Sequence, residues 1–186
     1  MSTVIPSRLF LTKGTGQHKE KLASLEQALR DAGIAPFNLV KVSSIFPPGC
    51  KLVSREEGLK TLHAGQIVFL VMSENSTNEA HRLISASIGL AIPSSPAHYG
   101  YLSEHHSFGQ NEKEAGLYAE KLATEMLATT LGRDFDTGQI WNGEDKKVFR
   151  ISKKLLVKTR SITQTTKGKK GLWTTALSAA VFLPNR

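Results

Sequence analysis

The order of strand-like and helical segments constrains this chain more than any other feature of its sequence. Apolar residues recur at helical spacing over 20–32 and 111–131, and a short helix is expected over 54–62. Around these helices, strands are expected over residues 7–12, 37–45, 66–72, 83–92, 99–105, 148–164 and 172–183. No repeat or linker interrupts this order, so the sequence predicts a single α+β domain over residues 1–186.

Individual residues predict where these elements begin and end and which side chains they bury. Gly14 and Gly16 are expected to end the first strand, and residues 167–171 to form the turn between the last two strands. Asn111 has the side chain of an N-cap for the long helix. Helical spacing predicts that the buried stripe of this helix consists of Leu117, Leu122, Met126 and Leu127.

The net charge of +8 is distributed unevenly along the chain. Residues 1–145 carry 13 basic and 16 acidic side chains, whereas residues 146–186 carry 11 basic side chains and no acidic one. A basic block of this kind can mark a nucleic-acid partner. In 148–162, however, the charges alternate with apolar residues, which favours a strand with one solvated face. A basic RNA-binding module that uses residues 146–170 remains the non-enzymatic alternative.

Several classes of site are excluded by what the sequence lacks. It contains no GxxxxGK[ST] loop and no GxSxG elbow, which argues against a P-loop and an α/β-hydrolase. Cys50 is the lone cysteine, so neither a disulfide framework nor a CxxC site can form. His105 and His106 are adjacent on an expected strand and point to opposite faces, so they cannot chelate one metal ion. No metal site is therefore expected.

The apolar runs indicate where the protein resides. The longest of them, such as 67–72, are far too short to span a bilayer. The first ten residues lack the basic and apolar regions of a secretory signal. We therefore expect a cytoplasmic protein without a membrane partner.

Ser43 and Ser44 end an apolar strand, just before Pro47 and Pro48. Taken alone, a serine pair at a strand end is common turn chemistry, with hydroxyls that satisfy nearby backbone groups. With its neighbours, however, this stretch, Val42-Ser43-Ser44-Ile45 followed by the two prolines, resembles the pyruvoyl-dependent arginine decarboxylase family. The resemblance continues through four further regions in the same order, namely 31–39, 84–93, 100–104 and 173–183.

This resemblance implies a fold, an assembly and a reaction. The fold would be a four-layer αββα sandwich, and the chains would form a homotrimer or hexamer with active sites between subunits. The Ser44 hydroxyl would attack the carbonyl of Ser43 and split the chain into residues 1–43 (the β chain) and 44–186 (the α chain). Ser44 would become a covalent pyruvoyl group, the electron sink for decarboxylation of L-arginine to agmatine, without pyridoxal phosphate or a metal.

The resemblance also assigns roles to three further residues. Glu104 would be the proton donor, with a pKa raised by desolvation among aromatic and apolar neighbours, although a surface glutamate is the alternative. Asn38 would assist self-cleavage, and its alternative is a strand-edge or turn residue. Glu26 would bind the substrate guanidinium, where relatives have aspartate; alternatively it only forms an i,i+4 pair with Arg30. The extra methylene of Glu26 keeps ornithine and lysine open as substrates.

Overall fold

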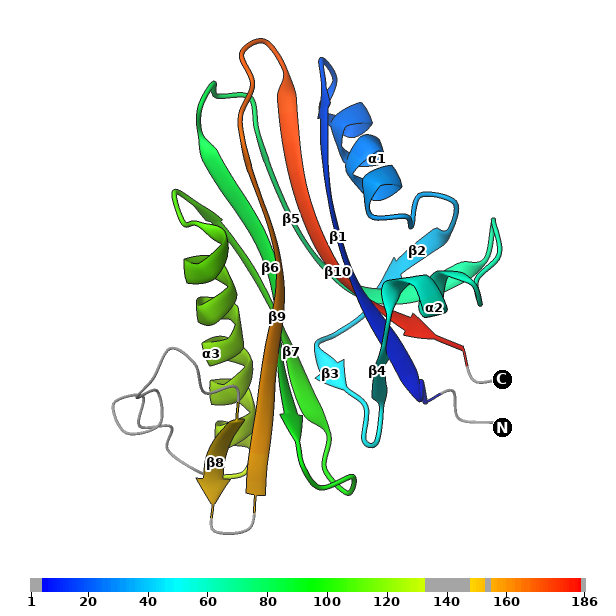
Figure 1. The fold of residues 1–186 in the computed structure, drawn as a ribbon, viewed down its shortest axis with the longest axis vertical. Coiled ribbons are helices and arrows are strands. Elements are labelled where there is room, and N and C mark those ends of the chain that lie inside the picture. Colours follow the sequence, from blue (N-terminus) through cyan, green and yellow to red (C-terminus); the bar gives the residue numbers. More distant parts are fainter. Residues whose placement is uncertain (1–4, 133–147, 153–154, 185–186) are drawn as a thin grey trace.

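The computed structural model describes residues 5–132, 148–152 and 155–184. The described strands form two sheets that face each other, and a long helix lies on the outer side of each sheet (Figure 1). Residues 146–147 and 153–154 of the basic block lie outside the described residues. The single α+β domain predicted from the sequence is confirmed.

Each sheet has five described strands. Sheet A contains, in order, β2 (Asn38–Lys41), β5 (Ile67–Thr77), β10 (Trp173–Leu183), β1 (Arg8–His18) and β4 (Lys51–Val53). Sheet B contains, in order, β3 (Ile45–Phe46), β7 (Gly100–Phe108), β6 (Leu83–Pro93), β9 (Leu155–Lys167) and β8 (Val148–Ser152). The described helices are α1 (Lys21–Asp31), α2 (Arg55–Leu59) and α3 (Glu112–Thr130), close to the three expected ranges.

Apolar side chains fill the space between the layers. The buried cluster between the two sheets consists of Leu9, Phe46, Cys50, Val71, Ile88, Leu90, Leu102, Ala180 and Phe182. A second cluster joins α1 to sheet A, and a smaller one joins α3 to sheet B. Burial of this apolar area is the main force that holds the sheets and helices together.

Small residues, not leucines, form most of the buried face of α3. Of the four residues expected there, only Leu127 is buried, while Leu117, Leu122 and Met126 are half-buried. The helix lies so close to β6 that a Cβ on Gly89 would be 2.2 Å from the carbonyl oxygen of Ala119. The contact face therefore consists mainly of Ala115, Gly116, Ala119, Glu120, Ala123, Thr124, Leu127 and Ala128.

A similar close approach explains why Gly14 and Gly16 do not end the first strand, contrary to expectation. β1 continues through both glycines to His18. A Cβ at Gly14 would lie 2.2 Å from the carbonyl oxygen of Ala28, and one at Gly16 would lie 2.1 Å from that of Ser24. These glycines therefore serve helix packing and not strand termination.

Two expected strands were wrong in their extent, because each is two strands in the structure. The segment 37–45 is not one strand, because β2 belongs to sheet A and β3 to sheet B. The segment 148–164 is split into β8 and β9, which pair antiparallel. The strands on either side of the 167–171 turn, β9 and β10, lie in different sheets. In the first two cases the change of sheet and the change of strand direction interrupt an apolar pattern that looks continuous in the sequence.

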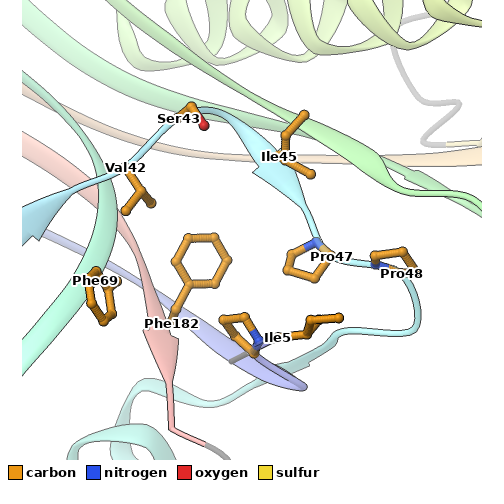
Figure 2. A pocket seen from close by; sticks show the side chains of 9 residues that line it. Ile5, Val42, Ser43, Ile45, Pro47, Pro48, Phe69 and Phe182 are labelled. Carbon is orange, nitrogen blue, oxygen red and sulfur yellow. The ribbon is translucent and has the colours of Figure 1, made fainter. Parts of the chain in front are cut away.

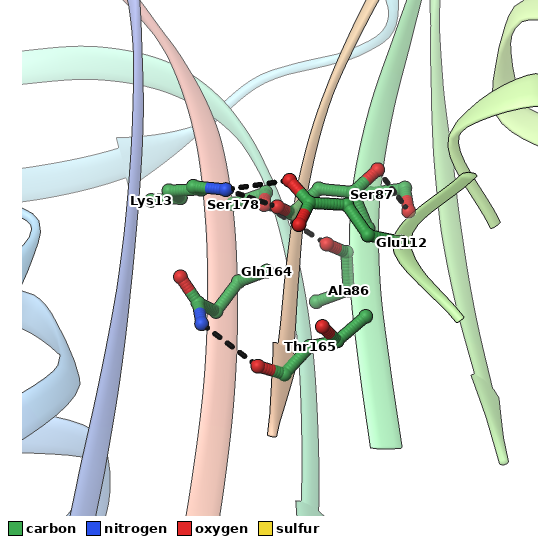
Figure 3. Close-up of polar contacts among 8 residues, drawn as sticks. Lys13, Ala86, Ser87, Glu112, Gln164, Thr165 and Ser178 are labelled. Atoms are coloured by element: carbon green, nitrogen blue, oxygen red, sulfur yellow. Dashed lines mark hydrogen bonds and ion pairs between the residues drawn. The ribbon is translucent and has the colours of Figure 1, made fainter. Parts of the chain in front are cut away.

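Polar contacts also join sheet A to sheet B and to α3. The Lys13 ammonium of β1 donates to the Glu112 carboxylate of α3 at 2.7 Å and to the carbonyl oxygen of Thr163 at 2.9 Å (Figure 3). The Ser178 hydroxyl of β10 donates to the carbonyl oxygen of Ala86 in β6 at 2.9 Å (Figure 3). These contacts fix sheet A relative to sheet B and α3.

Candidate active site

Ser43 and Ser44 lie where the chain crosses from sheet A to sheet B, between β2 and β3. On the sheet A side, the Val42 N–H donates to the carbonyl oxygen of Leu70 at 3.0 Å. On the sheet B side, the Leu102 N–H donates to the carbonyl oxygen of Ser44 at 2.8 Å. The peptide bond between the two serines is therefore held from both sheets.

A tight turn positions the carbonyl of Ser43. Its oxygen accepts a hydrogen bond of 3.0 Å from the N–H of Ile45, which closes a three-residue turn around Ser44. Among the described non-glycine residues, only His81 has a positive φ, so Ser44 is outside the left-handed region. A nucleophile that attacked this carbonyl would find the Ile45 N–H already directed at the developing negative charge.

An apolar pocket of about 470 Å³ adjoins the serine pair (Figure 2). Ser43 is exposed and supplies the polar side chain of the lining, while Ser44 is half-buried. The lining residues are Ile5, Pro6, Val42, Ser43, Ile45, Pro47, Pro48, Phe69 and Phe182. Within the described part of the chain, neither serine hydroxyl has a hydrogen-bond partner, so no base of the described residues contacts Ser44.

Glu104 lies on β7, two residues beyond the Leu102 amide that binds Ser44. Residues two apart on a strand share a face and are separated by roughly 7 Å. The Glu104 side chain is exposed at this edge, yet burial of its carboxyl group raises its pKa, while the positive charge of Lys41 and then that of His106 act in the opposite direction. The direction predicted from the sequence is confirmed: the carboxyl group holds its proton more strongly than an ordinary glutamate does.

Lys41 links the serine pair to sheet A. It lies at the end of β2, two residues before Ser43, and its ammonium group is 3.6 Å from the Glu74 carboxylate of β5. Nearby, the Ser73 hydroxyl donates to the carbonyl oxygen of His105 at 2.8 Å, which fixes β5 against β7 beside Glu104. We call these residues the serine cluster: Lys41, Ser43, Ser44 and Glu104.

The other predicted site residues lie on α1 and at the start of β2. The Glu26 carboxylate on α1 accepts a hydrogen bond of 2.9 Å from the Arg30 guanidinium, and both line a pocket of about 350 Å³ that reaches Pro36. The side-chain amide of Asn38, the first residue of β2, donates to the carbonyl oxygen of Gly65 at 2.7 Å. We call these residues the helix cluster: Glu26, Arg30 and Asn38.

One chain does not bring the two clusters together. Ser43 lies five positions after Asn38 along a nearly extended chain, a distance of roughly 16 Å at the rise of a β-strand. The pocket beside Ser43 and the pocket beside Glu26 share no lining residue. Within the chain, Asn38 and Glu26 therefore make the turn contact and the i,i+4 pair that were their alternatives.

Two further reactive side chains near the serine cluster, Cys50 and His105, are buried or hydrogen-bonded. Burial raises the pKa of the Cys50 thiol to about 11, so it is protonated at neutral pH. The Nε2 atom of His105 lies 2.7 Å from the side-chain oxygen of Gln110. In the part of the chain that the structure describes, no three His, Cys, Asp or Glu residues lie together as a metal site would require.

Sequence reasoning missed two features of the serine cluster. The donor to the Ser43 carbonyl is a backbone N–H, which has no side-chain signature in the sequence. Lys41 alternates with apolar residues in β2 and is typical of a solvated strand position, so its influence on Glu104 becomes visible only when the two sheets are placed side by side.

Comparison with known proteins identifies the class of this chain. A family model described as pyruvoyl-dependent arginine decarboxylase (PvlArgDC) matches residues 8–186. A protein of Chloroherpeton thalassium named probable pyruvoyl-dependent arginine decarboxylase is 56% identical over 183 residues, which cover 98% of this chain and 100% of the relative. The pyruvoyl-dependent arginine decarboxylase of Methanococcoides burtonii is 54% identical over 181 residues, which cover 97% of this chain and 99% of the relative.

These similarities define the chain as a carboxy-lyase. It belongs to the pyruvoyl-dependent arginine decarboxylase family. The family name assigns the catalytic electrophile to a covalent pyruvoyl group and not to pyridoxal phosphate. Across the described ranges, no helix has both the length and the apolar composition needed to cross a membrane.

Proposed function

We propose that this chain decarboxylates L-arginine to agmatine and CO₂ after it cleaves itself between Ser43 and Ser44. The observation that carries the proposal is the crossing between the sheets. There the Ser43 carbonyl has a hydrogen-bond donor, the Ile45 N–H, and the Ser44 hydroxyl has no partner among the described residues. The expected products are chains of residues 1–43 and 44–186, and the cytoplasm is the expected location.

The reactants in self-cleavage are the two serines and one water. The Ser44 oxygen attacks the Ser43 carbonyl carbon, and the amide becomes an ester while the Ser44 nitrogen becomes an amine. Loss of the Cα proton of Ser44 then expels the Ser43 carboxylate and leaves a dehydroalanine at position 44. Its imine tautomer adds water and releases ammonia, which leaves a pyruvoyl group. The Ile45 N–H would stabilise the negative charge on the Ser43 oxygen during the first step.

The residues around position 44 fit a pyruvoyl group. Bound to a substrate, such a group accepts the electron pair that decarboxylation releases. Glu104 would return a proton to the substrate carbon that has lost CO₂, and its place on β7 and its raised pKa support this role. The apolar pocket beside Ser43 would keep water away from a substrate bound there.

We further propose that the active site is shared between subunits of a trimer or hexamer of four-layer αββα sandwiches. Two observations support this assembly: no base of the described chain contacts Ser44, and within the chain Asn38 lies roughly 16 Å from Ser43 while Glu26 lines a different pocket. A head-to-tail interface can place the helix cluster of one subunit against the serine cluster of the next. Glu26 would then bind the arginine guanidinium, and Asn38 would assist cleavage.

The intact mass of the purified protein tests this proposal. We expect two chains separated after Ser43, with the larger one lighter by one ammonia than simple hydrolysis would leave it. Ser44→Ala should give a single uncut and inactive chain. Ser43→Ala is the matched control and should still be cleaved, because cleavage uses the carbonyl of Ser43 and not its hydroxyl. A wild-type chain that stays uncut and inactive, or an active Ser44→Ala protein, would refute the proposal.

A further inference from the structure

We propose that Arg30 is a built-in competitor of the substrate for the Glu26 carboxylate. The inference rests on the proposed function, in which Glu26 binds the guanidinium of arginine. Arg30 carries the same guanidinium group, and its Nε atom lies 2.9 Å from Oε1 of Glu26. A substrate that reaches Glu26 must therefore displace Arg30 or share the carboxylate with it.

The pocket leaves room for this exchange. Both side chains line the cavity of about 350 Å³ beside the end of α1 and Pro36. The Glu26 side chain is 44% exposed and that of Arg30 is 70% exposed, so the carboxylate faces solvent and the guanidinium can swing away from it. A planar guanidinium can take both oxygens of a carboxylate, whereas the contact of Arg30 through Nε reaches only Oε1.

The contacts of Arg30 favour a residue that competes for Glu26 over one that orients Glu26 for the substrate. Across the described residues, Glu26 is the one partner that its guanidinium binds. A side chain without a second anchor cannot hold a carboxylate rigidly, so Arg30 does not orient Glu26 for the substrate. Exposed pairs at i,i+4 are weak, and such a competitor should weaken substrate binding by about twofold.

If Arg30 competes with the substrate, its removal should strengthen ligand binding, whereas if Arg30 positions Glu26, its removal should weaken ligand binding. Removing a competitor strengthens ligand binding and lowers KM without changing kcat, since the pair is broken before chemistry begins. Removing a positioning residue would weaken binding. A competitor also affects every cationic substrate equally, so the preference for arginine over lysine should not change.

The test is calorimetric titration of the self-cleaved protein with agmatine, together with KM and kcat for arginine. We expect Arg30→Gln to bind agmatine about twofold more tightly, with unchanged kcat. Lys60→Gln is the matched control, because Lys60 forms the equivalent i,i+4 pair with Glu56 on α2, and it should change nothing. Unchanged or weaker binding by Arg30→Gln would overturn the inference.

A double-mutant cycle separates this inference from the function on which it rests. If Arg30 acts through Glu26, Arg30→Gln should have no effect in a Glu26→Gln background. If Arg30→Gln still strengthens agmatine binding in the Glu26→Gln background, Arg30 acts by general charge repulsion, which contradicts competition for Glu26. If Glu26→Gln itself leaves agmatine binding unchanged, the proposed role of Glu26 fails.

Discussion

The serine cluster and the helix cluster are built in different ways, although one short strand connects them. The peptide bond of the serine cluster is fixed by backbone hydrogen bonds to Leu70 on one sheet and to Leu102 on the other. The helix cluster depends on side chains, namely the Glu26–Arg30 pair on an exposed helix and the Asn38 amide on a loop carbonyl. In the proposed function, the chemistry is thus placed by the backbone, and recognition depends on side chains.

This difference tells us which changes each region tolerates. A backbone position held from two sheets does not move when one side chain is replaced, so substitutions at Ser44 and Glu104 should remove individual chemical steps. An exposed pair on a helix is weak and can be rearranged, so substitutions in the helix cluster should change affinity.

The largest effect in this comparison is expected for Glu104→Gln. The amide cannot donate the proton that the substrate carbon needs, so kcat should fall by roughly 10²–10⁴-fold. Self-cleavage should persist, because Glu104 does not hold the Ser43 carbonyl. The measurement is kcat for the cleaved chain, with its cleavage verified by mass. A cleaved variant with wild-type kcat would remove Glu104 from the chemistry.

Glu26→Ala should have a smaller effect, of a different kind. Loss of a charge-assisted hydrogen bond costs about 1.5–3 kcal/mol, which corresponds to a roughly 10- to 150-fold rise in KM for arginine with little change in kcat. Glu56→Ala is the matched control, because it removes the acidic partner of the other exposed i,i+4 pair without touching the helix cluster. If kcat fell and KM did not change, the contrast between chemistry and recognition would be wrong.

The smallest effect is expected in the pH profile. The proton donor must be protonated, so activity should decline as pH rises through the raised pKa of Glu104. The positive charges of Lys41 and His106 lower this pKa, so Lys41→Gln should move the decline to higher pH. Lys51→Gln removes the same charge from β4, on the opposite edge of sheet A, and should leave the profile unchanged. A decline that moved to lower pH would contradict this electrostatic account.

Much of the fold could be predicted from local sequence patterns. Helical spacing located the three helices, and the Asn111 cap is confirmed by its bond to the Glu114 N–H. The crossing at Ser43 could not be predicted, because the apolar pattern continues from β2 into β3 while the hydrogen-bond partners change from β5 to β7. The small-residue face of α3 was missed for a similar reason, since the helix–sheet distance is set by tertiary packing at Gly89.

The candidate site, like the fold, could be predicted from the sequence only in part. The direction of the Glu104 pKa was predicted correctly, although Tyr101, one of the neighbours expected to desolvate it, faces α3, where its hydroxyl contacts that of Thr130. The separation of Asn38 and Glu26 from the serines was not predicted, since the resemblance names the residues without saying which chain supplies them. The extended course of β2 reveals the separation for Asn38, and the two distinct pockets reveal it for Glu26.

The most direct test of a shared site is to combine two defective chains. We would co-express Ser44→Ala and Glu26→Ala chains with different tags, purify the mixed oligomers, and assay them at an arginine concentration well below the KM of Glu26→Ala. If the clusters of different subunits meet, some interfaces contain an intact pair, and activity should exceed the sum of the two parent proteins. Mixed oligomers no more active than that sum would show that each chain builds its own site, and would contradict the account.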